Sequence, residues 1–291
     1  MNTQRTATPA TAGTPATAGT LAAATKLAIG LAFIMTGTLC ALFFVTNTEV
    51  PTWVILLGRW IPALASLAAL LIVGHRKVAE TWRLRPVSFR NIATSYGLAL
   101  AVMLVVLAVP VLASLAVGAD PIGADQLLFA LPLLLLGPLL FGLSTLGEEV
   151  LWRGHLLSAW RHWGFWPMSL AIAGIWMAWH LPLHGLMWHQ GLLSTTEALT
   201  STIGIAFWSP LLTALVLRMG TVWPAVFAHA VPASSLNLIT EAGRAHPPAY
   251  WTVVVASWLV MLLATVAIRR LSNPVQKPPR AVVNPPSTAI D

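Results

Sequence analysis

Residues 249–268 read AYWTVVVASWLVMLLATVAI, a run of twenty residues without a single charge. A helix of about 20 apolar residues is long enough to cross the roughly 30 Å hydrocarbon layer of a bilayer. The pattern therefore predicts an all-α, polytopic transmembrane bundle of about eight spans. The seven other apolar segments lie at residues 24–45, 53–74, 92–117, 133–161, 167–186, 198–217 and 222–240.

The composition supports this fold class, because 57% of the 291 residues are hydrophobic and only 9% are charged. A soluble domain normally has about a quarter charged residues, and so few charges cannot cover a water-facing surface. We predict a bundle over residues 24–270. The polar, Ala/Thr/Pro-rich ends at 1–23 and 271–291 have little to bury and are expected to be disordered tails. Pro132 and Pro138 predict a kinked or re-entrant start to the fourth span.

The positive charges are distributed asymmetrically around the predicted spans. Apart from Arg59 and Arg153, which fall within spans, every Lys and Arg except Arg244 lies at one set of helix ends. This bias predicts that both termini are cytoplasmic and that the chain is a multi-pass protein of the plasma membrane. The formal charge of +7 is then a topology signal. We expect membrane lipid as a partner and exclude nucleic acid.

Three charged residues stand inside the predicted fourth span, at Glu148, Glu149 and Arg153. An ionisable group near the bilayer centre costs about 2.5–3.5 kcal/mol on insertion scales. Glu149 and Arg153 have the i, i+4 spacing that favours an ion pair. This assignment leaves Glu148 free, and a free carboxylate in a small wet pocket can deprotonate a water molecule. Arg59 is a further intramembrane charge, and two alternatives are open for it: the side chain snorkels to the interface, or it pairs with an acid such as Glu149.

The next span contributes His180. Residues 159–167, AWRHWGFWP, read as a turn at the membrane interface, centred on Gly164. Glu148 lies 16 residues before Gly164 and His180 lies 16 residues after it. Two antiparallel helices that leave one tight turn keep such residues at similar depth, here roughly 20 Å along each helix at 1.5 Å per residue. We therefore predict that Glu148 and His180 meet.

His229 is the third candidate, nine residues beyond the Gly220 turn and so only about 13 Å deep. A lone buried histidine is as often a hydrogen-bonded core residue as a functional one. Glu148, Glu149 and Arg153 of the fourth span could likewise have a purely structural role in packing this helix against its neighbours. His155 is expected at an interfacial position, and His184 in solvated surroundings near a helix end.

Taken together, these motifs resemble those of the CPBP family of intramembrane proteases, which includes the type II CAAX prenyl proteases and the bacteriocin-processing proteins with the ABI domain. The Glu-Glu-x-x-x-Arg motif is present as Glu148-Glu149-x-x-x-Arg153, followed by Gly154. Trp176-x-x-x-His180 matches Phe-x-x-x-His, with Trp in place of Phe. His229 matches the start of His-x-x-x-Asn, but Ala233 stands where Asn is expected. The resemblance covers roughly residues 130–240.

The resemblance implies a hydrolase that cleaves peptide bonds of membrane-associated proteins or peptides, in CAAX-type or leader-peptide processing. It implies that Glu148 activates water, that His180 helps to position it and that His229 stabilises the oxyanion. Glu149 and Arg153 would support the site. The expected cofactor is none, or Zn2+ if the protein is a metalloprotease, with Glu148, His180 and His229 as ligands.

Two other functions remain open at this point. Because Ala233 departs from the family pattern, the chain can be an inactive member that acts as a membrane scaffold or bacteriocin-immunity protein. Buried acids and histidines also serve proton-coupled transporters, although such proteins show internal repeats of broken helices.

Overall fold

The computed structural model describes residues 15–116, 124–231 and 247–272, which are helical with short connections and contain no strand. The helices are α1 (Pro15–Val45), α2 (Thr52–Gly58), α3 (Ile61–Ile72), α4 (Val78–Thr81), α5 (Phe89–Ala116), α6 (Ala124–Glu149), the π-helix η1 (Val150–Leu156), α7 (Leu157–Ala159), α8 (Phe165–His189), α9 (Thr195–Met219), α10 (Trp223–Val231) and α12 (Pro247–Leu271).

Seven stretches of the described chain are long and apolar enough to cross a membrane, which confirms a multi-pass all-α fold. The expected span at 222–240 is described only as far as Val231, at the end of the nine-residue helix α10. The other seven expected spans coincide with the stretches Gly19–Val45, Thr52–Ile72, Phe89–Ala113, Leu134–Ala159, Phe165–His189, Thr195–Met219 and Tyr250–Leu271.

Two expectations about helix boundaries are wrong. Helix α1 begins at Pro15, so residues 15–23 belong to the first helix; proline is favourable in a first helical turn, and the following alanines have high helix propensity. Helix α6 runs continuously from Ala124 to Glu149 and includes both Pro132 and Pro138, so of the two expected forms, kinked or re-entrant, the re-entrant one is wrong.

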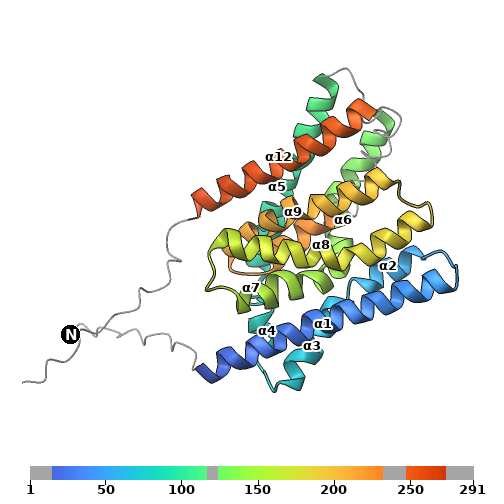
Figure 1. Cartoon of the computed structure of the whole chain (residues 1–291). Coiled ribbons are helices and arrows are strands. Elements are labelled where there is room, and N and C mark those ends of the chain that lie inside the picture. Colours follow the sequence, from blue (N-terminus) through green and yellow to red (C-terminus); the bar gives the residue numbers. More distant parts are fainter. Residues whose placement is uncertain (1–14, 117–123, 232–246, 273–291) are drawn as a thin grey trace, which may run out of the picture.

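Helix α10 lies at the centre of the bundle. It packs against α5, α6 and α9, while α12 packs on α5 and α9 and α1 packs on α3 and α8 (Figure 1). Every residue from Pro224 to Val231 is buried. A nine-residue helix spans only about 13 Å, so α10 carries His229 into the interior without crossing the bundle.

The second span is broken in its middle, between α2 and α3, at Arg59 and Trp60. Pro62, in the first turn of α3, is compatible with a new helix start at this point. The break lies against Gly147 of α6, where an added Cβ atom would come within 2.5 Å of the Arg59 carbonyl oxygen. Only glycine allows the two backbones to approach this closely, and the approach brings Arg59 beside the Glu148 motif.

Immediately after Glu149 the helix widens into the π-helix η1, where a regular α-helix was expected. Gly154 in η1 touches the backbone of Trp82, and a Cβ atom there would lie 2.7 Å from the Trp82 Cα. The two glycines that flank the motif are therefore both contact points for other segments of backbone.

His155 in η1 joins three further segments. Its Nε2 lies 3.1 Å from Thr25 Oγ1 of α1, and its Nδ1 lies 2.8 Å from Ser66 Oγ of α3. The indole of Trp82 also donates to Ser66 Oγ at 2.8 Å. His155 is therefore fully buried in the protein, with a partner for each ring nitrogen.

Candidate active site

Glu149 is the acceptor of two hydrogen bonds in the bundle interior. Its Oε1 accepts from Arg153 Nη1 at 3.0 Å and from His229 Nδ1 at 2.8 Å. The Glu149 and Arg153 side chains are completely buried, and His229 is 6% exposed. The pair expected from the i, i+4 spacing is confirmed, and the structure adds His229 as its third member.

Glu148 is also buried, and both of its carboxylate oxygens face donors. Oε2 accepts a 2.8 Å hydrogen bond from the indole Nε1 of Trp176 in α8. Oε1 forms an ion pair with Arg59 Nε at 3.4 Å. The expectation of a free Glu148 is therefore wrong, and the conceivable partner of Arg59 is corrected from Glu149 to Glu148.

Trp176 lies between the charged groups and the histidines. The Arg153 guanidinium sits over its ring, 4.1 Å from the centroid, in a cation–π arrangement that suits a desolvated arginine. The rings of His229 and His180 approach Trp176 edge-on, with centroids at 5.2 and 5.6 Å. Trp176, which stands in place of the Phe of the family motif, thus contacts two histidines and two charged residues: His180, His229, Arg153 and Glu148.

His180 reaches the site through Trp176, with no direct hydrogen bond to Glu148 among the described residues. Its Nδ1 lies 3.0 Å from the Trp176 carbonyl oxygen, one turn earlier in α8. A carbonyl oxygen only accepts, so Nδ1 carries the proton and Nε2 of a neutral ring keeps a lone pair. Glu148 and His180 are therefore close to each other because both contact the indole of Trp176.

His184 extends this histidine pair one turn further along α8. Its ring centroid is 5.1 Å from that of His180, and its Nδ1 lies 2.7 Å from Thr202 Oγ1 of α9. The residue is half-buried rather than solvated, because α8 continues to His189. The i, i+4 spacing of the two histidines was the available sequence signal.

The depth mismatch expected for His229 is removed by the position of the turn before α10. Gly220 ends α9 with φ of 72°, and the next two residues, Thr221 and Val222, are buried. The carbonyl oxygen of Arg83, in the loop after α4, accepts 3.0 Å hydrogen bonds from Thr221 Oγ1 and Val222 N. Burial, together with the nearby Arg161, lowers the pKa of the Arg83 guanidinium. The turn is thus buried against the loop, and His229 reaches Glu149 although it lies only nine residues beyond Gly220.

The three candidate zinc ligands do not converge. Glu148 contacts Arg59 and Trp176, His229 contacts Glu149, and the Nδ1 of His180 faces a backbone oxygen. Across residues 15–116, 124–231 and 247–272, no three His, Cys, Asp or Glu side chains are grouped closely enough to hold a metal ion. The arrangement of these side chains does not fit a zinc site.

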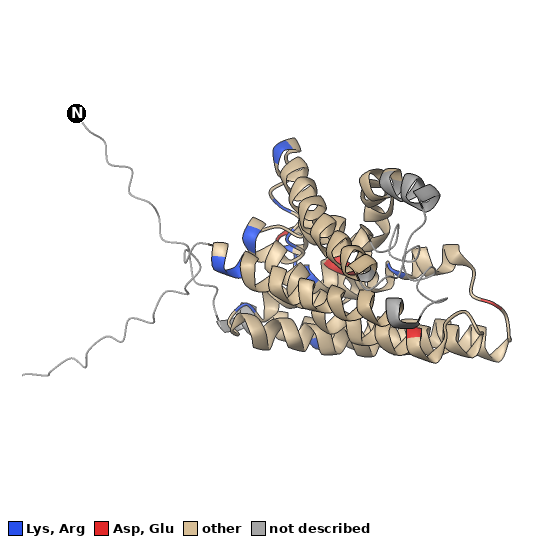
Figure 2. Cartoon of the chain, turned by 90° about the horizontal axis from the view of Figure 1, so that it is seen from above, with Lys and Arg blue, Asp and Glu red and all other residues tan. Residues whose placement is uncertain are grey.

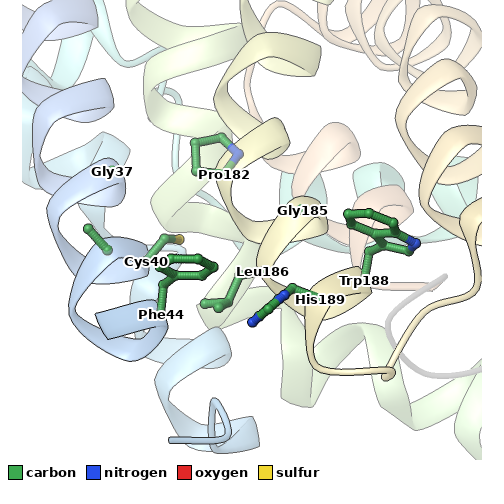
Figure 3. A pocket seen from close by; sticks show the side chains of 9 residues that line it. Gly37, Cys40, Phe44, Pro182, Gly185, Leu186, Trp188 and His189 are labelled. Atoms are coloured by element: carbon green, nitrogen blue, oxygen red, sulfur yellow. The ribbon is translucent and has the colours of Figure 1, made fainter. Parts of the chain in front are cut away.

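An apolar groove of about 360 Å³ lies elsewhere, between α1 and α8 (Figure 3). It contains none of the charged residues of the site. Small residues on both helices open it, and its lining is Gly37, Cys40, Ala41, Phe44, Pro182, Gly185, Leu186, Trp188 and His189.

Ala233 lies outside the described residues, so the third motif is seen only through His229. Comparison with known proteins gives one family match. Residues 124–233 match the family described as Rce1-like, type II CAAX prenyl endopeptidase. No curated protein and no solved structure gives a significant match. The matched segment holds Glu148, Glu149, Arg153, His180 and His229, and the chain therefore contains, at residues 124–233, a domain of the Rce1-like type II CAAX prenyl endopeptidase family.

Proposed function

We propose that this protein is an intramembrane endopeptidase in which Glu148 is the general base. The observation that carries the proposal is the state of this carboxylate. It is 1% exposed inside an apolar helix, and it is held by side chains from two other segments. A buried charge of this kind costs several kcal/mol unless it is compensated. Its compensation beside two histidines favours a chemical role over a purely structural one.

In the proposed reaction, Glu148 accepts a proton from a water molecule as the water oxygen bonds to the carbonyl carbon of the scissile peptide. The carbonyl oxygen becomes an oxyanion. When the C–N bond breaks, Glu148 passes the proton to the leaving nitrogen, so the carboxylate is regenerated. The products are a new carboxyl group and a new amine, and no redox partner is needed.

The two histidines have different proposed tasks. The unprotonated Nε2 of His180 is suited to accept a hydrogen bond from the attacking water, because Nδ1 is held by the Trp176 carbonyl. His229 donates from Nδ1 to Glu149. Stabilisation of an oxyanion through its Nε2 requires a proton on that nitrogen, so the ring must either take up a second proton or give its Nδ1 proton to Glu149.

The expected substrates are membrane-associated proteins or peptides. The family description names prenyl endopeptidases, so CAAX-type processing is the first candidate, and leader-peptide processing is the alternative. We also propose a multi-pass protein of the plasma membrane, with membrane lipid as its surroundings and both termini in the cytoplasm. Figure 2 supports this orientation, since Lys and Arg gather at the end of the bundle where α1 starts and α12 finishes.

The decisive experiment is cleavage of an internally quenched, farnesylated CAAX peptide by the purified full chain in detergent. Glu148→Gln keeps the shape of the side chain but removes the base. We expect it to lower kcat by at least about 10²-fold, the lower range for general acid–base catalysis. Full activity of the Glu148→Gln protein would end the proposal.

A second candidate is a member of the family that has lost catalysis and acts as a membrane scaffold or immunity-type protein. Ala233 in place of the expected Asn favours it. It predicts that Glu148→Gln complements a deletion phenotype fully, whereas the protease requires the carboxylate.

A further inference from the structure

We propose that Arg59 is a positioning residue of this active site, contributed from outside the segment that matches the family. It holds the carboxylate of Glu148 in one orientation, and it keeps a positive charge beside the reacting carbonyl. This inference rests on the proposed function of Glu148.

The local fold is built to bring Arg59 to this place. Helix α2 ends at Gly58 and α3 begins at Ile61, so Arg59 lies at a break in the middle of a span. The backbone of Arg59 packs directly on Gly147, the residue before Glu148. The break between α2 and α3 packs on Gly147, and this contact fixes the position of the Arg59 Cα beside Glu148.

Each carboxylate of the motif has an arginine within ion-pair distance. Arg153 Nη1 lies 3.0 Å from Glu149 Oε1. The remaining carboxylate is compensated by Arg59 at 3.4 Å. The ionisable groups around Glu148, from all segments packed on it, are Arg59, Glu149, Arg153, His180, His184 and His229.

Arg59 also has donor capacity to spare. Its Nη1 is buried and has no hydrogen-bond partner among the described residues. In the reaction, Glu148 becomes neutral as it takes the proton, and negative charge moves to the carbonyl oxygen. A guanidinium that keeps Nε on Glu148 and offers its Nη1 to the carbonyl oxygen follows the negative charge as it moves, so the proposed hydrogen bond from Nη1 is made mainly in the transition state. Its loss is therefore expected in kcat more than in KM.

The test uses the full chain in detergent and the same farnesylated, quenched CAAX peptide. We expect Arg59→Gln to lower kcat by about 10²-fold with KM within about twofold, as for an interaction made mainly in the transition state. Arg59→Lys keeps the charge and is expected to retain at least about a tenth of kcat, since a tenfold loss corresponds to only 1.4 kcal/mol. Arg90→Gln is the matched control at an exposed arginine and should leave both constants unchanged.

Thermal unfolding in detergent provides a second measurement that does not depend on cleavage. If Arg59 pairs with Glu148, the stability change caused by Arg59→Gln should be different in the Glu148→Gln background. If the stability changes of the two single variants simply add in the double variant, the inference is overturned. It is also overturned if Arg59→Gln has a normal kcat while Glu148→Gln is inactive. An active Glu148→Gln protein instead overturns the proposed function itself.

Discussion

Gly147→Ala tests whether the close contact between α6 and the α2–α3 break supports the site. A Cβ atom at this position would lie 2.5 Å from the Arg59 carbonyl oxygen and 2.7 Å from the Trp60 Cα. Non-bonded carbon atoms rest at roughly 3.5–4.0 Å, so the break must retreat by at least about 0.8 Å. Because the neighbouring atoms are backbone, no side-chain rotation can relieve the overlap.

The expected magnitude combines two opposing effects. Alanine is favoured over glycine by about 1 kcal/mol in a helix interior. Overpacking typically costs about 1–3 kcal/mol, and a backbone neighbour places this site at the upper end. We therefore expect a net loss of about 1–2 kcal/mol in stability. A retreat of this size also lengthens the Arg59–Glu148 contact beyond its present 3.4 Å, so cleavage should fall as well.

The assay is thermal unfolding of the purified protein in detergent, followed by tryptophan fluorescence, together with peptide cleavage. Gly174→Ala in α8 is the matched control, because a Cβ atom there meets nothing within 4 Å. It should be neutral or slightly stabilising, through helix propensity alone. A Gly147→Ala protein that unfolds at the wild-type temperature and cleaves normally would refute the reasoning.

Three further predictions follow from the same contacts. Trp176→Phe removes the donor to Glu148 and should lower kcat about tenfold, near the net worth of a hydrogen bond to a charged group; Trp179→Phe removes a buried N–H without a partner in the described chain and should change kcat less than twofold. His155→Ala should destabilise the protein by about 2–4 kcal/mol in thermal unfolding, because it leaves a cavity and removes one hydrogen-bond partner from each of two buried hydroxyls; an unchanged unfolding temperature would contradict this. Chelators should leave cleavage unchanged, because the three candidate zinc ligands do not converge; loss of cleavage that added zinc restores would contradict this.

Much of the fold was predictable from hydropathy, because each helix that crosses a bilayer needs about 20 apolar residues, and each such run can be recognised in the sequence by itself. The Glu149–Arg153 pair was predictable for a similar reason, since both residues lie on one helix at a fixed spacing. Helix ends were less predictable. Helix α1 begins at Pro15 within a polar stretch, where alanine propensity rather than hydropathy decides the boundary.

The contacts of Glu148 were not predictable, because they depend on backbone geometry from distant segments. The ion pair with Arg59 requires a helix break and a glycine contact across 89 positions of sequence. A lone arginine inside a span left both snorkelling and an acidic partner open, and spacing alone does not choose between the two adjacent acids. The depth of His229 likewise depends on hydrogen bonds between the turn at Thr221 and a loop far away in sequence.

The loop after α4 has a consequence for where foreign sequence can be inserted. Surface loops usually accept tags and reporters, but this loop is not uniform. Trp82 lies against Gly154, and the Arg83 carbonyl anchors the start of α10. An epitope placed between Trp82 and Arg83 would disturb α10, the helix that carries His229. Residues 87–88 are exposed and should accommodate one. Insertion mapping along this short segment would therefore change from tolerant to intolerant within a few positions.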